Sequence, residues 1–199
     1  MSAKFSVAES HHHYDADSVD VFGFWLYILT DCILFATLFA TFVVLTYQGM
    51  QPILLKQYID LYDVLIETFL LLGSNFTFCL SFLSLQNKNI ARAQMWLMIT
   101  FLLGAGFIVI EVREFIHLAM EGFRWNFNGQ ASSFFALVGT HGLHVSFGLL
   151  WILVMMFQMS SAKLKPILHK RMTYLGLFWN FLDIVWIFVF TIVYLMGAM

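Results

Sequence analysis

Five long apolar segments, separated by short polar ones, dominate the pattern of the chain. They cover approximately residues 22–47, 61–85, 93–120, 132–159 and 172–196. Each exceeds the ~20 residues that a helix rising ~1.5 Å per residue needs to cross ~30 Å of hydrocarbon. None alternates apolar and polar positions with a period of two, which excludes barrel strands. The pattern therefore predicts an all-α membrane protein, with a bundle of five transmembrane helices forming one domain over residues 22–199.

The remaining segments are polar and short. Residues 1–21 are polar and acidic and lack the apolar core of a signal peptide, so we predict a flexible cytoplasmic tail there. Pro52 and Pro166, the two prolines of the sequence, fall in predicted connections, so no predicted helix is interrupted by proline. The connections leave no room for a second domain.

Composition agrees with a membrane location. The 199 residues are 61% hydrophobic and 11% charged, against about 25% charged in an average soluble protein, and the mean hydropathy is +0.82. A net charge of −2 gives no reason to expect a nucleic-acid partner. Cys32 and Cys79 lie inside apolar segments and are interpreted as small buried side chains rather than as a disulfide or metal ligands.

The distribution of lysine and arginine predicts the orientation. Positive residues concentrate on the cytoplasmic side of membrane proteins. The side that carries the N-terminus has seven in this sequence: Lys4, Lys88, Arg92, Lys163, Lys165, Lys170 and Arg171. The opposite side has Lys56 and Arg124. We therefore expect a cytoplasmic N-terminus and a periplasmic C-terminus.

Four polar residues are expected near the middle of the membrane. The helical rise places Asp31 about 14 Å and Asp183 about 17 Å from the cytoplasmic side, and His141 and His144 about 14 and 18 Å from the other side. Such groups are costly in lipid and normally face protein or water. Because glycines flank the histidines and let neighbouring helices approach, we interpret the histidines as packing residues, hydrogen-bonded to Asp183 or Asp31.

The other intramembrane charges lie toward the external side. Glu67 is about 9 Å from the external end of the second helix and is the most isolated acid. It is interpreted as a helix-packing hydrogen-bond donor, with a proton carrier or a lipid or quinone contact as alternatives. Glu111, Arg113, Glu114 and His117 fall near the external interface, where a local salt-bridge cluster at a helix end is expected.

A metal site is not expected in this chain. Glu114 and His117 have the Glu-x-x-His spacing of di-iron bundles, but such sites use two of these motifs and two further glutamates. His141 and His144 lie deeper by several ångströms, and no second helix carries a histidine at their depth to complete a haem site.

Several segments together resemble subunit III of the haem-copper respiratory oxidases, with the greatest likeness to the cytochrome bo-type ubiquinol oxidases. They are FGFWLYILTDCILF (22–35), IETFLLL (66–72), GAGFI (104–108), EVREFIH (111–117), SFFALVGTHGLHV (133–145) and WNFLDIVWIFVFTIVYLMGAM (179–199). The resemblance covers nearly everything after the tail. Asn180 departs from it, because family members commonly have a histidine there, and asparagine does not titrate near neutral pH.

The resemblance implies a non-catalytic subunit of a bacterial inner-membrane complex that couples ubiquinol oxidation to oxygen reduction and proton pumping. Subunit I would be the main contact and would hold haem b, haem o and copper, with subunits II and IV as further partners and phospholipid bound in a cleft. The resemblance assigns Glu67 to the buried carboxylate of that cleft. It assigns His141, His144 and Asp183 to polar packing positions, and Glu111 and Glu114 to an acidic cluster of the third helix.

Three alternatives remain open. One is subunit III of a cytochrome c oxidase. Another is a small proton or solute transporter that uses Asp31, Glu67, His141 and Asp183 as a relay, although the proline-free helices and the lack of an internal repeat weigh against it. The last is a membrane metalloenzyme.

Overall fold

The computed structural model describes residues 3–48, 61–120, 122, 128–159 and 165–195, and all the regular structure in these residues is helical. In chain order the helices are α1 (Ala3–Gln48), α2 (Leu61–Gln86), α3 (Ile90–Met120), α4 (Gly129–Met159), α5 (Lys165–Phe188) and the π-helix η3 (Val189–Leu195). Five spans within them are long and apolar enough to cross a membrane: Val19–Thr46, Tyr62–Gln86, Ile90–Met120, Gly129–Met159 and Leu168–Leu195. The prediction of five transmembrane helices is confirmed, and the protein is a multi-pass membrane protein.

The start of α1 differs from the prediction. The helix begins at Ala3 and therefore includes residues expected to form an irregular tail. Neither proline nor glycine occurs between Ala3 and Phe22, so nothing in the sequence ends the helix before its apolar part begins. The chain forms two compact units, Met1–Thr37 and Leu38–Met199, and the second contains the bundle and the last part of α1.

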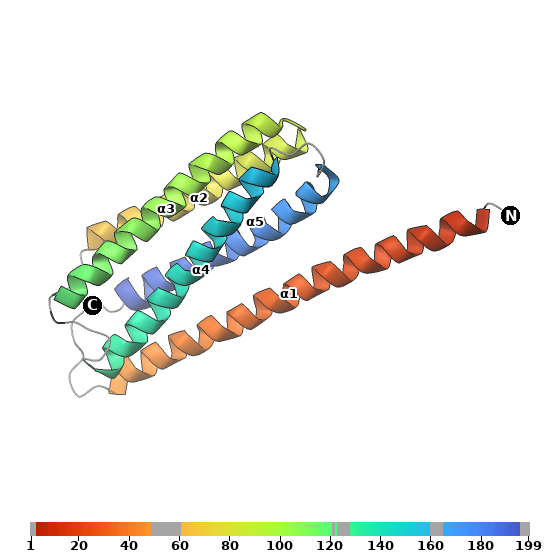
Figure 1. The fold of residues 1–199 in the computed structure, drawn as a ribbon. Helices are drawn as coiled ribbons and strands as arrows, with labels where there is room; N and C mark the ends of the chain where they lie inside the picture. The colour runs from red at the N-terminus through yellow and green to blue at the C-terminus, as the bar shows by residue number, and fades with distance from the viewer. Residues whose placement is uncertain (1–2, 49–60, 121, 123–127, 160–164, 196–199) are drawn as a thin grey trace. The chain divides into compact units, whose positions relative to one another are not determined.

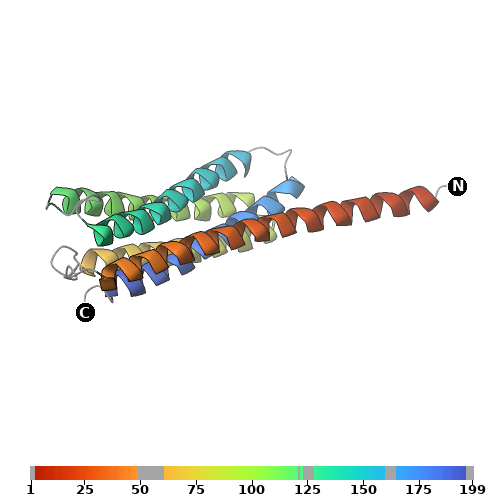
Figure 2. The same cartoon turned by 90° about the horizontal axis from the view of Figure 1, so that it is seen from below.

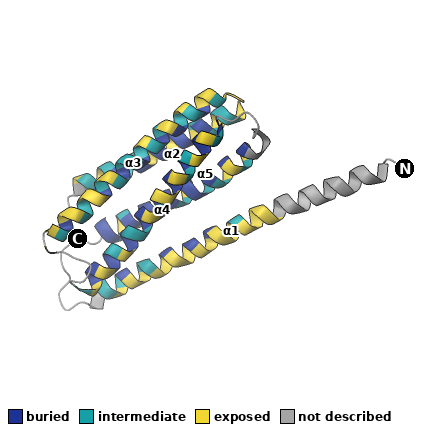
Figure 3. Cartoon of the chain, in the orientation of Figure 1, coloured by how far each residue is buried: buried dark blue, intermediate teal, exposed yellow. Residues whose placement is uncertain are grey.

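Helices α2 to α5 form a four-helix bundle, seen in two views in Figures 1 and 2. Helix α2 packs against α3, α3 against α4, α4 against α5, and α5 again against α2, which closes the ring. Figure 3 shows the buried residues of these helices gathered on the faces that they turn toward one another. The outward faces are apolar as well, as expected where the surroundings are lipid or another membrane subunit.

One tryptophan at the centre of the bundle contacts the other three helices. The ring of Trp179 on α5 lies against Gly104 of α3 and Gly148 of α4, where an added Cβ atom would come within 3.2 and 2.8 Å of it. Its indole N–H donates a hydrogen bond to the hydroxyl of Ser74 on α2, 3.1 Å away. The two glycines thus admit a large side chain whose polar atom still finds a partner.

A tight turn and hydroxyl contacts join α2 to α3. The hydroxyls of Thr77 and Thr100 lie 2.8 Å apart, and Ser81 donates to the carbonyl of Ala93 at 2.7 Å. In the turn, Lys88 has a φ of 59°, and the N–H of Asn89 bonds to the carbonyl of Ser84 at 3.0 Å. This is the Schellman arrangement that ends a helix at a left-handed residue.

The fifth span changes its helical form along its length. Pro166, expected in a connection, belongs to the first turn of α5, where its missing N–H is not needed. The last seven residues, Val189–Leu195, form the π-helix η3. Some residues used in the sequence arguments lie outside the described ranges: Pro52, Lys56, Arg124 and Lys163.

Candidate functional site

Three glutamates of α2 and α3 come together inside the bundle. The two helices are antiparallel neighbours, so the start of α2, where Glu67 lies, meets the end of α3, where Glu111 and Glu114 lie. Glu67 is completely buried and Glu111 is 3% exposed. Glu67 is within electrostatic reach of both other glutamates and of Asp63. The sequence-based view of Glu67 as an isolated acid is therefore wrong.

The carboxyl group of Glu111 occupies space left by a glycine on α4. Both of its oxygens lie 2.5 Å from the position that a Cβ atom on Gly142 would take. Gly142 stands between His141 and His144, so the glycine of this His-Gly-Leu-His segment makes room for an acid of the neighbouring helix. The predicted close approach at glycines of α4 is confirmed here and at Gly148.

The hydroxyl group of Tyr194 on η3 lies beside these acids. We call the three glutamates Glu67, Glu111 and Glu114, together with Tyr194, the carboxyl cluster. The Tyr194 hydroxyl donates a long hydrogen bond to Oε2 of Glu114, at 3.5 Å. The tyrosine is 2% exposed, and its ring lies 6.1 Å from that of Phe134. Tyrosines near span ends usually lie at the membrane interface, so the sequence position of Tyr194 does not by itself indicate this contact.

The polar atoms of the carboxyl cluster are only partly satisfied. Within the described residues, both oxygens of Glu67 and the Oε1 atoms of Glu111 and Glu114 accept no hydrogen bond. Buried oxygens of this kind are rare in native structures, and each requires a partner such as ordered water.

Arg113 does not join these acids, which corrects the expected salt-bridge cluster at the end of α3. It points outward and lies 3.9 Å from Asp63 of α2, with 77% of the arginine side chain and 37% of the aspartate side chain exposed. His117 is exposed as well. Residues on one helix turn share their depth but face different directions, and here the two glutamates face the bundle while Arg113 and His117 face outward.

The two histidines differ in their surroundings. His141 is fully buried, with its ring 5.3 Å from Trp186 and 5.9 Å from Phe107. His144 is half-buried, and its Nδ1 lies 2.8 Å from the carbonyl of Thr140 on the same helix.

The expected bond from these histidines to Asp183 is not present. Neither histidine ring donates a hydrogen bond to the carboxyl group of Asp183, whose neighbouring polar side chain is Asn75 of α2. The depths estimated from the helical rise give the position of each residue along its helix. They do not give the direction in which its side chain faces around the helix. Asp31 belongs to the first unit, and its pairing with a histidine stays a prediction.

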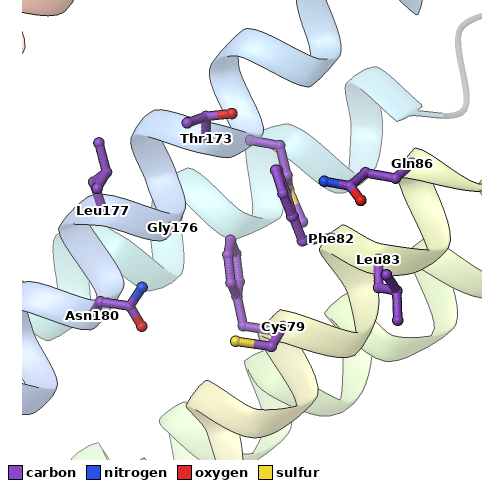
Figure 4. Close-up of a pocket in the computed structure, with 10 residues that line it drawn as sticks. Cys79, Phe82, Leu83, Gln86, Thr173, Gly176, Leu177 and Asn180 are labelled. Carbon is purple, nitrogen blue, oxygen red and sulfur yellow. The ribbon is translucent and has the colours of Figure 1, made fainter.

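A groove of about 490 Å³ lies between α2 and α5 (Figure 4). Its walls are mainly apolar, with polar atoms from a few side chains. They are formed by Phe78, Cys79, Phe82, Leu83, Gln86, Met172, Thr173, Gly176, Leu177 and Asn180. Cys79 and Asn180 are exposed there, and Cys32 of α1 is exposed too, so the prediction of buried cysteines is wrong.

The described residues hold no group of three or more histidine, cysteine, aspartate or glutamate side chains arranged to bind a metal ion. The Glu114–His117 spacing does not form one, because Glu114 faces Tyr194 while His117 is exposed.

Comparison with known proteins identifies the family. Residues 4–198 match the family described as cytochrome c oxidase subunit III. The chain belongs to this family. It is 50% identical over 194 residues to cytochrome bo(3) ubiquinol oxidase subunit 3 of Pseudomonas aeruginosa, covering 97% of this chain and 93% of the relative.

Two relatives from Bacillus subtilis show the breadth of the family. Quinol oxidase subunit 3 is 38% identical and covers 96% of this chain and 94% of its own length. Cytochrome c oxidase subunit 3 is 41% identical, and the match covers 88% of this chain and 85% of the relative. Membership of the subunit III family implies assembly with other oxidase subunits.

Proposed function

We propose that the chain is the non-catalytic subunit III of a proton-pumping terminal ubiquinol oxidase in a bacterial inner membrane. The observation that carries this proposal is the 50% identity, over nearly the whole chain, to a protein named as a ubiquinol oxidase subunit. Subunit I would hold haem b, haem o and copper and form the main contact, and subunits II and IV would complete the complex. Cytochrome c oxidase is the alternative, because a subunit of that name is also similar.

Purification through a tag on this chain tests the proposal. We expect the purified material to contain the larger oxidase subunits, to show the optical spectra of haem b and haem o, and to consume oxygen with ubiquinol but not with reduced cytochrome c. Oxidation of cytochrome c, together with a subunit II that contains a copper pair, would establish the alternative. Purification of the chain without any haem-bearing partner would contradict both.

Within this complex we propose that the chain stabilises subunit I, supports its proton uptake and binds phospholipid. The α2–α5 groove supports lipid binding, because its apolar walls and its volume suit an acyl chain, and pockets of about 300–1,000 Å³ are typical for small ligands. Glu67, which the resemblance assigns to the buried carboxylate of a lipid cleft, is completely buried and does not line this groove. The amide of Asn180, exposed in the groove, offers a hydrogen-bonding group to a lipid ester.

A variant with a larger side chain in the groove tests the proposal that phospholipid binds there. Leu83→Trp places a bulky ring in the groove, whereas Leu72→Trp adds the same ring to an exposed position of α2 outside it. We expect less phospholipid to copurify with Leu83→Trp than with the control, measured by mass spectrometry of the intact complex. Equal lipid content in the two variants would show that the groove is not the lipid site.

A further inference from the structure

The carboxyl cluster has polar atoms that nothing in the described structure satisfies. Four oxygens from two helices, both of Glu67 and one each of Glu111 and Glu114, accept no hydrogen bond from the described residues. A buried polar group in a membrane span costs free energy unless it has a partner, so these oxygens favour a small polar partner beside them. The oxygens belong to the neighbouring helices α2 and α3, and Glu67 is within electrostatic reach of the other two acids, so both helices offer polar partners of the kind that a buried water molecule needs.

Within the ranges that the structure describes, no lysine or arginine supplies the missing partner. Arg113, the arginine nearest to these acids on α3, pairs with Asp63 outside the cluster, and no described group of side chains is arranged to hold a metal ion. From α4 the cluster meets the backbone of Gly142, and the nearby imidazole of His141 lies between the rings of Trp186 and Phe107. From η3 it meets the hydroxyl of Tyr194. Protons and water are therefore the species that suit these carboxyl groups.

The acids between the cluster and the end of the bundle become more exposed step by step. Asp63 lies one turn before Glu67 on α2 and is partly exposed. It is within electrostatic reach of both Glu67 and Glu114. The acids thus run from Asp63 at the surface through Glu114, which is half-buried, to Glu67 and Glu111 in the interior. Acidic chains of this kind form proton relays in membrane proteins.

We propose that Glu67, Glu111 and Glu114 enclose ordered water, share protons through it, and exchange those protons with the aqueous phase through Asp63. Each transfer breaks one O–H bond on a carboxyl group or water and forms one on the next oxygen, so no oxidant or reductant is required. Tyr194 is a positioning residue that holds Glu114 by its hydroxyl. The proposal concerns this chain alone and stands whether the complex oxidises ubiquinol or cytochrome c.

Infrared spectroscopy of the full chain, purified with its partners, tests the proposal. The C=O stretch of protonated carboxyl groups is recorded before and after transfer from H₂O to D₂O, and the spectrum of each variant is subtracted from that of the wild type. We expect Glu67→Gln to remove one band and to shift the bands of the remaining cluster acids, because they are coupled through water. Asp183→Asn is the matched control, a buried acid outside the cluster, and should remove its own signal without shifting the others.

Two milder variants test the path and the positioning. Asp63→Asn should leave the cluster bands in place and slow their shift in D₂O severalfold. Tyr194→Phe should shift the Glu114 band directly, and an accompanying shift of the Glu67 and Glu111 bands decides the question of coupling if Glu67→Gln fails to assemble. Cluster bands that are absent, that do not respond to D₂O, or that disappear one by one without shifting their neighbours would overturn the proposal. A D₂O response as fast in Asp63→Asn as in the wild type would overturn the assigned path.

Discussion

At the scale of single residues, Gly142 explains why the His-Gly-Leu-His segment is not a ligand pair. The glycine between the histidines accommodates the Glu111 carboxyl group, and His141 packs against aromatic rings. The segment is therefore a contact between α4 and its neighbours. Its most constrained position is the glycine rather than either imidazole.

Replacing Gly142 by alanine should disturb this contact. The new methyl group would lie 2.5 Å from the Glu111 oxygens, so the carboxyl group must move. We expect the free energy of unfolding to fall by about 1–3 kcal/mol, as is typical for an overpacked site. Unfolding of the purified protein in mixed micelles of increasing SDS content provides the measurement.

Gly139→Ala is the matched control for this prediction. It lies one helical turn away on α4, and its added methyl group would meet Phe115 at an ordinary 3.7 Å. Little change is expected there. Equal losses of stability in the two variants would mean that helix propensity, and not the Glu111 contact, sets the cost.

The identity of the buried polar residues could be predicted from the sequence, but their partners could not. Glu67, His141 and Asp183 were expected inside the membrane and Glu111 near its external interface, and all four are buried in the bundle. In a membrane bundle the lipid-facing and protein-facing sides are both apolar, so periodicity does not fix the rotation of a helix. For Glu67 and Glu111 a usable signal existed, because both are near the same end of antiparallel helices. The contact of Tyr194 depends on η3, which no sequence pattern indicated.

At the scale of elements, the π-helix η3 sets the direction of Tyr194. A π-helix arises when residues are added to an α-helical path, and it often occurs at functional sites. Inserting one further residue into η3 should turn the residues that follow it by about 100°, the turn per residue of an α-helix. Thr191 is exposed and its hydroxyl bonds within the span, to the carbonyl of Ile187, so the position after it is suitable for the insertion.

An alanine inserted after Thr191 should therefore separate Tyr194 from Glu114 while leaving the helix intact. The measurement is the infrared signal of the tyrosine and of the Glu114 carboxyl group, with circular dichroism as a check on helix content. A Glu114 signal unchanged from wild type would show that η3 does not position Tyr194. The Thr191→Ala variant, which keeps the length of η3, is the control.

The turn between α2 and α3 offers a stabilising change. Lys88 is the one non-glycine residue with positive φ in the described ranges, and a side chain there costs about 1–2 kcal/mol relative to ordinary helical backbone. Lys88→Gly should raise the free energy of unfolding by up to about 1 kcal/mol, since glycine adopts this backbone conformation without steric cost. The comparison is with Asn87→Gly, at a residue without positive φ, which should not stabilise. A loss of stability in Lys88→Gly would mean that a contact of the lysine side chain stabilises the protein by more than the strained backbone costs.

The limits of the helices could be predicted closely because the membrane dictates them. A span needs about 20 apolar residues and satisfied backbone groups, and both requirements appear in the sequence as long apolar segments. α2, α3 and α4 begin and end within a few residues of the predicted limits. The extension of α1 to Ala3 was missed, because polarity was taken to mean irregular structure although no residue there breaks a helix.

At the scale of the whole molecule, the bundle places the carboxyl cluster at a defined end. That end contains the starts of α2 and α4 and the ends of α3 and η3. The orientation of the chain in the membrane therefore decides which aqueous phase exchanges protons with the cluster. The seven positive residues on the N-terminal side, against two on the other, favour a periplasmic location for the cluster end.

Reporter fusions test this orientation directly. Alkaline phosphatase is active only after export, and green fluorescent protein folds to its fluorescent form in the cytoplasm. We expect a phosphatase fused to the C-terminus to be active and a fluorescent protein fused there to be dark. A fluorescent protein fused to the N-terminus should fluoresce. The charge dependence is tested by exchanging Lys88 and Arg92 for glutamine, which should reduce phosphatase activity by weakening the retention of the α2–α3 turn in the cytoplasm. A fluorescent C-terminal fusion would reverse the orientation and would make the cytoplasm the source of the protons that reach Asp63.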